Sequence, residues 1–219
     1  MRGLAPIESY PGIQLGHVVT LLNVTVREDV GWMCMDTMTL GEKDRDLFQQ
    51  SKMLPLVHVN AVFGCRGDLQ FLWFLFPTCC LMRVTDFDEL LNAWPECLAQ
   101  ATLGYFQQSG RTGFDVIGSE QNVALLGWSN SRERPVCLTA VRTPGRNSFD
   151  VAEAIVPFVA PDPGHAVPCV PTLLAMESLA REQVSKVRHD FPGAPIGGRL
   201  LLAEVTRKGT SIRELATLG

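Results

Sequence analysis

The chain has 219 residues, of which 46% are hydrophobic, and a formal net charge of -4 at neutral pH. This length and apolar content are enough for a full hydrophobic core, and we expect residues 1–219 to form a single domain. Because nucleic acid is bound by basic surfaces, the acidic balance predicts no nucleic-acid partner.

The seven cysteines lie mostly within apolar segments, with neither a C-x-x-C pair nor a histidine at ligand spacing. This pattern predicts buried free thiols in a reducing compartment and no metal site. The N-terminal segment lacks the apolar core of a secretory signal. The most apolar run, residues 69–82, is shorter than the about 20 residues that cross a bilayer. We therefore expect a cytoplasmic protein without a membrane partner.

The first sixty or so residues predict two antiparallel hairpins, formed by residues 18–27 with 30–36 and by residues 52–57 with 59–65. The first of these segments alternates and is rich in β-branched side chains, which is typical of a strand. We interpret the polar segment between the hairpins, residues 37–51, as a solvated excursion.

Two helices are predicted next. Asp68 is a capping residue for an apolar helix over residues 69–82, and the Thr85 to Glu89 segment is a second start signal, for a helix over 90–108. Pro95 should kink that helix or mark a late start. The aromatic run from Phe71 to Phe76 exceeds what one helix face needs for its own core, so part of it should lie at a subunit contact.

The second half of the chain returns to strand patterns. We expect a hairpin of residues 123–128 with 136–141 and a closing hairpin of residues 200–205 with 210–215. Prolines stiffen a loop over 143–171, which leaves room for one short strand around 154–159. Thr172 caps a helix whose apolar residues recur at three- and four-residue steps: Leu173, Met176, Ala180, Val184 and Val187.

The order of these elements predicts the fold class. Strand pairs that are adjacent in sequence favour antiparallel sheets, and helices that come in blocks argue against alternating βαβ winding. We therefore expect an α+β protein, a four-layer αββα sandwich of two antiparallel sheets flanked by helices.

Thr20, Asp36 and Lys52 follow one another at intervals of sixteen residues, and each stands at the edge of an apolar stretch. Thr20 opens the first expected strand, Asp36 ends the second and Lys52 heads the third. This arrangement predicts that the three side chains form the polar corner of one site built by sheets.

The segment over residues 20–39 resembles the opening of proteasome β-type subunits and of bacterial proteasome-like peptidases, which are N-terminal nucleophile (Ntn) hydrolases. In that family a threonine begins a strand, and a second apolar strand ends in Ala-Asp-Ser or a variant, whose place Met35-Asp36-Thr37 takes. The family's lysine follows at the spacing of Lys52, and Gly64-Cys-Arg-Gly67 is similar to its small-residue turn before the first helix. The motifs that carry this resemblance lie within residues 18–110.

The resemblance implies hydrolysis of peptide or amide bonds without a metal or cofactor. The Thr20 hydroxyl would attack a carbonyl carbon while its own α-amino group, with a free pKa of roughly 7.7 to 8, acts as base. Lys52 would lower the basicity of that amine and stabilise negative charge, and Asp36 would hold Lys52 in place. Backbone N–H groups of the Gly64 to Gly67 turn would stabilise the oxyanion.

A second interpretation stays open. The α-amino group exists only after the Val19-Thr20 bond is cut, so that residues 1–19 are a candidate propeptide or N-terminal extension. The family usually has glycine before its threonine, whereas this chain has Val19. The alternative is a non-catalytic structural or assembly subunit that keeps the fold uncleaved, with Asp36 and Lys52 as a structural ion pair.

Two further expectations come from the resemblance. The family's downstream serine and aspartate have no clear match, and Asp162 is a candidate for the aspartate. Both interpretations imply a homo-oligomer, of which a ring is one form.

Overall fold

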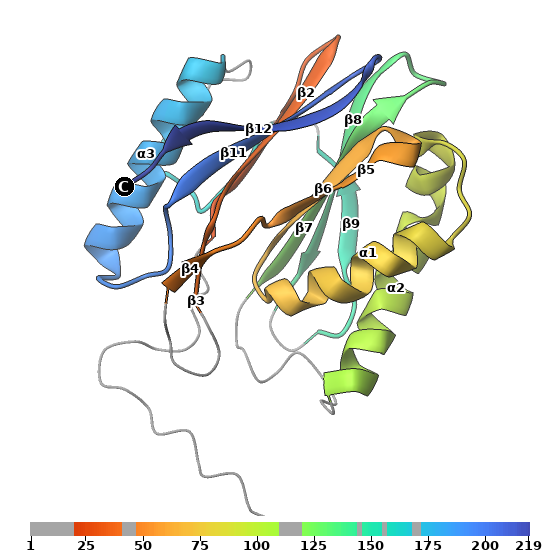
Figure 1. Cartoon of the computed structure of the whole chain (residues 1–219), viewed down its shortest axis with the longest axis horizontal. Helices are drawn as coiled ribbons and strands as arrows, with labels where there is room; N and C mark the ends of the chain where they lie inside the picture. The colour runs from red at the N-terminus through yellow and green to blue at the C-terminus, as the bar shows by residue number, and fades with distance from the viewer. Residues whose placement is uncertain (1–19, 41–46, 110–119, 144–145, 155–156, 168–171) are drawn as a thin grey trace, which may run out of the picture.

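A computed structural model of the chain describes residues 20–40, 47–109, 120–143, 146–154, 157–167 and 172–219. Two antiparallel five-stranded sheets lie face to face (Figure 1). Helix α3 (Leu173–Asp190) covers the outer face of one sheet, and α1 (Leu72–Leu81) and α2 (Phe87–Ser109) cover the outer face of the other. The expected αββα sandwich of class α+β is confirmed.

The first sheet, under α3, has the strand order β10-β1-β2-β11-β12. It contains both the opening and the closing hairpin that the sequence predicts, and β2 pairs with β11, so the two ends of the described chain meet in one sheet. Its strands are β1 (Leu22–Val26), β2 (Val30–Asp36), β10 (Phe158–Ala160), β11 (Arg199–Thr206) and β12 (Gly209–Thr217).

The second sheet, under α1 and α2, has the strand order β5-β6-β7-β8-β9. The two hairpins predicted for it are confirmed, although β7 and β8 are longer than their apolar segments because the polar ends pair as well. Its strands are β5 (Met53–Leu56), β6 (Ala61–Arg66), β7 (Gln121–Ser129), β8 (Arg134–Arg142) and β9 (Asp150–Glu153), with a 3₁₀ turn η1 (Val57–Val59) after β5.

The loop expected over residues 143–171 contains two short strands instead of one. β9 extends the second sheet beside β8, and β10 extends the first sheet beside β1. The single strand expected around 154–159 is therefore right only at its end, where β10 begins, and β9 was not expected. Edge strands of three or four residues are stabilised by the partner strand more than by their own propensity, so the sequence signals them weakly.

The solvated excursion expected over residues 37–51 is also wrong in part. Its described ends form a two-stranded hairpin, β3 (Met38–Leu40) with β4 (Leu47–Gln49), while residues 41–46 lie outside the described chain. The N–H groups of Thr37 and Met38 donate to Gly197 O at 3.2 and 3.1 Å, and Gln50 N donates to Thr37 O at 2.8 Å. Backbone hydrogen bonds thus hold the described ends of this polar segment.

The helix starts agree with the capping signals. Asp68 accepts from Gln70 N at 2.9 Å and caps a 3₁₀ turn, η2 (Leu69–Phe71), that leads directly into α1. The Glu89 carboxylate accepts from Thr85 N at 2.7 Å, and α2 begins at Phe87. A late start at Pro95 is wrong, because this cap has already set the first turn and the helix continues past the proline.

Helix α3 has the predicted cap and the predicted apolar face. Thr172 Oγ1 accepts from Ala175 N at 3.2 Å, and Met176, Ala180, Val184 and Val187 are buried against the first sheet. A second apolar layer fills the space between the sheets, with Leu22, Val24, Met33 and Met35 on one side and Val62, Ala124 and Leu126 on the other.

The six described cysteines are free thiols, and five of them are buried as expected. Cys80 is the exception, because it lies on the exposed face of α1. Cys169 lies outside the described residues. Within the described chain, no helix combines the length and the apolar character that crossing a bilayer requires.

Candidate functional site

Thr20, Asp36 and Lys52 meet at one end of the sandwich. Lys52 Nζ donates to Thr20 Oγ1 at 3.1 Å and to both carboxylate oxygens of Asp36 at 3.0 Å. The three side chains are almost completely buried, with exposed fractions of 1%, 0% and 1%. The predicted convergence of these residues is confirmed as geometry.

The two sheets supply these residues from three strand ends. Thr20 lies two residues before β1, and Asp36 is the last residue of β2. Because Leu22 faces Met35 in this hairpin, the start of β1 lies directly beside Asp36. Lys52 immediately precedes β5, where its carbonyl accepts from Cys65 N at 3.0 Å, and its side chain reaches from the second sheet to the first.

The Asp36 carboxylate has a full set of donors. Leu21 N donates to Oδ1 at 2.9 Å and Gly197 N to Oδ2 at 3.0 Å, in addition to the two bonds from Lys52. Burial raises the pKa of the Asp36 carboxyl, while the Lys52 ammonium and the two amides act in the opposite direction. Burial likewise lowers the pKa of Lys52, against the attraction of Asp36.

Gly197 is a site residue that the sequence did not single out. It lies between α3 and β11 with φ +120°, and a Cβ at this position would lie 2.5 Å from Arg188 Nη2. That guanidinium nitrogen donates to Ile196 O at 2.9 Å and thereby holds the loop. Nothing local to the Gly197-Gly198 pair in the sequence points toward Asp36.

Gly64 is not part of a turn, contrary to the expectation for the oxyanion site. It lies inside β6, where a Cβ would come within 2.5 Å of Met35 Sδ in the layer between the sheets. Cys65 N–H points toward Lys52, just before β5, and N–H groups alternate in direction along a strand, so Gly64 N–H faces Ala124 on β7. The amide of Gly64 is therefore committed to the sheet.

Gly67 does lie in a turn, directly after β6. Its φ is +115°, and a Cβ would lie 2.3 Å from Gln121 Oε1, so glycine is the residue that fits this position. Its amide stays a candidate oxyanion donor.

Asp162 follows β10, whose Ala160 faces Leu22 of β1. It is exposed, and its carboxylate accepts from Gly164 N at 2.8 Å within its own loop. In the described structure, the Asp162 carboxylate is therefore bound within its own turn and is not part of the group around Lys52.

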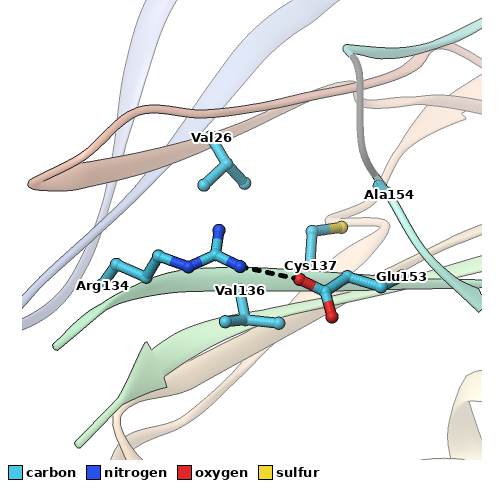
Figure 2. Close-up of a pocket in the computed structure, with 6 residues that line it drawn as sticks. All are labelled: Val26, Arg134, Val136, Cys137, Glu153 and Ala154. Carbon is cyan, nitrogen blue, oxygen red and sulfur yellow. Dashed lines mark hydrogen bonds and ion pairs between the residues drawn. The ribbon is translucent and has the colours of Figure 1, made fainter. Parts of the chain in front are cut away.

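A cavity of about 220 Å³ lies at the other end of β1 from Thr20, between the two sheets. Figure 2 shows the Arg134 guanidinium directed at the Glu153 carboxylate beside Val26 and Cys137. Arg134 and Arg132 both pair with Glu153, at 3.0 and 2.7 Å. This cavity is thus separate from the group around Lys52.

Comparison with known proteins gives a result for the structure but not for the sequence. No family profile matches the chain. No curated protein matches it either. Among solved structures, the Gly-1 mutant of Anbu from Hyphomicrobium sp. strain MC1 superposes with a TM-score of 0.61 at 14% identity, covering 90% of this chain and 87% of that one.

A second structure of Anbu from the same strain has a TM-score of 0.60 at 13% identity, over 90% of this chain and 86% of that one. At such identities the likeness concerns the fold alone.

Proposed function

We propose that the chain is a proteasome-like N-terminal-threonine hydrolase that cuts peptide or amide bonds, with Thr20 as nucleophile. The observation that carries this proposal is the bond from Lys52 Nζ to Thr20 Oγ1 at 3.1 Å, in a group that also contains buried Asp36. An ammonium at this distance stabilises negative charge on the attacking oxygen, and low exposure strengthens that effect.

The proposed reaction needs a base that accepts the proton of the Thr20 hydroxyl. Once Thr20 is the first residue, its α-amino group takes that proton as Oγ1 attacks the substrate carbonyl carbon, and passes it to the leaving amine. Water then hydrolyses the resulting ester, which releases the acid and restores the hydroxyl. The amide of Gly67 is our candidate to stabilise the oxyanion.

Maturation would use the same nucleophile. Thr20 Oγ1 attacks the carbonyl carbon of Val19, an ester replaces the Val19-Thr20 amide, and water cleaves the ester to free the α-amino group. Residues 1–19 are released as a propeptide in this scheme. Lys52 and Asp36 are already in contact in the uncut chain, so the cleavage would not require them to rearrange.

The proposal is tested by the intact mass and N-terminal sequence of the purified protein. We expect a species that begins at Thr20, and we expect it to be absent from the Thr20→Ala variant. Thr25→Ala is the matched control, since Thr25 is also a buried threonine of the same hairpin and should leave cleavage unchanged. Full-length mass for the wild-type protein in its assembled state would refute the hydrolase proposal.

The alternative function is a structural or assembly subunit that keeps residues 1–19. Two observations favour it: Asp36 and Lys52 form a buried ion pair without a substrate, and Thr20 is only 1% exposed in the uncut chain. A wild-type protein that keeps its full mass, and whose Lys52→Ala variant loses stability but no reaction, would establish this alternative.

We also propose that the protein associates with itself in either role. The aromatic run from which the sequence predicts a subunit contact is divided between the core and the surface. Phe71 and Leu75 are buried, whereas Trp73 and Phe76 are exposed. An exposed apolar surface of this kind on a folded protein indicates an interaction site.

A further inference from the structure

Gln121 is a buried glutamine beside the turn that contains Gly67. It is the first residue of β7, and its exposed fraction is 1%. Val123, two residues later on the same face of the strand, belongs to the core under α1 and α2. Burying a primary amide in such a core costs free energy unless its N–H and C=O groups find partners. The partners of Gln121 therefore indicate what this residue does.

The side-chain amide of Gln121 bonds the chain on both sides of Gly67. Its Oε1 accepts from Asp68 N at 2.7 Å, and its Nε2 donates to Asp68 O at 3.3 Å. Nε2 also donates to Cys65 Sγ, two residues before Gly67. Because the oxygen meets an N–H and the nitrogen meets a carbonyl and a thiol, this contact fixes the orientation of the amide.

The shape of the turn is matched to Gln121. Gln121 Oε1 occupies the place that a Cβ at position 67 would need, at 2.3 Å. The φ of Gly67, +115°, is open to glycine and strained for other residues. The path of the turn and the position of the glutamine amide are therefore fixed together.

Asp68 is anchored through its side chain as well. Tyr105 OH donates to Asp68 Oδ2, and Gln70 N donates to Oδ1 at 2.9 Å. Tyr105 is completely buried in the core of α2 and packs edge-on against Phe71. The residue after Gly67 is thus held at its backbone by β7 and at its carboxylate by α2.

The direction of β6 places the Gly67 amide on the side of Lys52. Cys65 N donates to Lys52 O at 3.0 Å. Because N–H groups alternate along a strand, the N–H of Gly67, two residues after Cys65, lies on the same side. The pairing of β6 with β5 ends at Gly64 and Met53, so Gly67 stands beyond it. Lys52 is also the residue whose Nζ contacts Thr20 Oγ1.

We propose that Gln121 is a positioning residue that fixes the Gly67 amide for the oxyanion of the reaction. The inference rests on the hydrolase function proposed above and adds a residue that the sequence did not single out. A donor stabilises an oxyanion best when its direction is set before the reaction, because it then needs no reorganisation. Gln121 acts through the turn and not by contact with the substrate.

Gln121→Met tests the proposal, since methionine is a similarly long, unbranched side chain without the amide. Gln183→Met is the matched control. Gln183 is 0% exposed, exchanges two bonds with Asn23 at 2.7 and 3.2 Å, and donates to Pro161 O at 2.5 Å. It therefore has the same burial and three comparable bonds, on α3 over the first sheet. Urea unfolding should show a similar loss of stability in both variants.

Kinetics of the mature protein measure the effect. Intact mass first gives the fraction of each preparation that begins at Thr20, and rates are divided by this fraction. With the fluorogenic peptide amide that the wild-type protein cuts fastest, we expect Gln121→Met to lower kcat about 10- to 100-fold and to keep KM within about threefold. Gln183→Met should keep both constants within about threefold of wild type.

A peptide aldehyde of the same sequence reports on the oxyanion position directly. Thr20 Oγ1 adds to the aldehyde carbon, the hydroxyl proton passes to the former carbonyl oxygen, and no group leaves. Because that oxygen lies where the oxyanion forms, inhibition of Gln121→Met should weaken by about the factor by which kcat falls. A loss of stability alone would leave this inhibition constant unchanged in the folded, mature fraction.

The outcomes separate this inference from the function on which it rests. Wild-type protein that is never cleaved and cuts no peptide amide would overturn both. An active wild type with unchanged kcat and aldehyde inhibition in Gln121→Met would overturn the positioning role alone. So would an equal loss of kcat in Gln183→Met, or a loss confined to KM.

Gln121→Asn serves if the methionine variant does not fold. It keeps a buried amide but is shorter by one methylene, so its amide cannot reach both Asp68 N and Asp68 O as Gln121 does. We expect kcat to fall about 10-fold, with KM again little changed. Full kcat in this variant would count against the positioning role.

Discussion

Replacing Thr20 with alanine is expected to reduce the hydrolysis of peptide and amide substrates by at least about 10³-fold, to the background of a protein without its nucleophile. The methyl group of alanine removes the oxygen that Lys52 Nζ contacts at 3.1 Å and leaves no atom that can attack a carbonyl. Release of the fluorophore from a panel of fluorogenic peptide amides measures this loss.

Two variants test whether the activity is lost because the nucleophilic hydroxyl is missing. Thr20→Ser keeps a hydroxyl in the same position and should retain a substantial part of the activity. Thr25→Ala removes a different buried hydroxyl, at the other end of β1, and should retain nearly all of it. Activity that survives in Thr20→Ala would assign any hydrolysis to another residue or to a contaminant.

Replacing Lys52 with alanine is expected to lower the free energy of unfolding by about 3 to 5 kcal/mol, because it leaves the Asp36 carboxylate buried without its counter-charge. Asp36 would keep only the amides of Leu21 and Gly197 as donors. Urea unfolding followed by tryptophan fluorescence and circular dichroism measures the change. The same variant should also be inactive and uncleaved if the hydrolase proposal is right.

The pH dependence of the stability loss in Lys52→Ala tests whether the uncompensated charge of Asp36 is its cause. Burial already raises the pKa of Asp36 in the wild-type protein, and removing the nearby ammonium raises it further. Between the pKa of an unfolded aspartate, about 3.9, and the raised pKa of Asp36 in the folded variant, the folded chain holds a proton that the unfolded chain has lost, so the stability of the variant increases as pH falls through this range. The deficit relative to wild type should shrink toward pH 4.

A neutral double variant is the matched control for the Lys52 prediction. Asp36→Asn with Lys52→Met removes both charges, while the asparagine oxygen can still accept from one of the two amides. This variant should be more stable than Lys52→Ala at neutral pH. Equal stability would mean that the lysine stabilises the fold by packing and not by its charge.

The group of Thr20, Asp36 and Lys52 was visible in the sequence because each of its members marks the end of a strand. Thr20, Asp36 and Lys52 stand at the borders of apolar segments, and polar residues at such borders project from the ends of a sheet. The same alternation of apolar segments, turns and capped helices predicted both sheets, the three long helices and the layer order. Local patterns carry this information since the elements form from neighbouring residues.

The sequence by itself therefore determined the fold class, the hairpins, the helix caps and the three residues that meet. The tertiary structure alone decided the rest. Gly197 reaches Asp36 from 161 positions away, and no local pattern encodes a contact at that separation. Gly64 belongs to the strand and not to the turn, since the approach of Met35 from the opposite sheet requires a residue without a side chain there. The exposed face of α1 was likewise decided by packing: a helix that is apolar all round has no preferred face until a sheet covers one side.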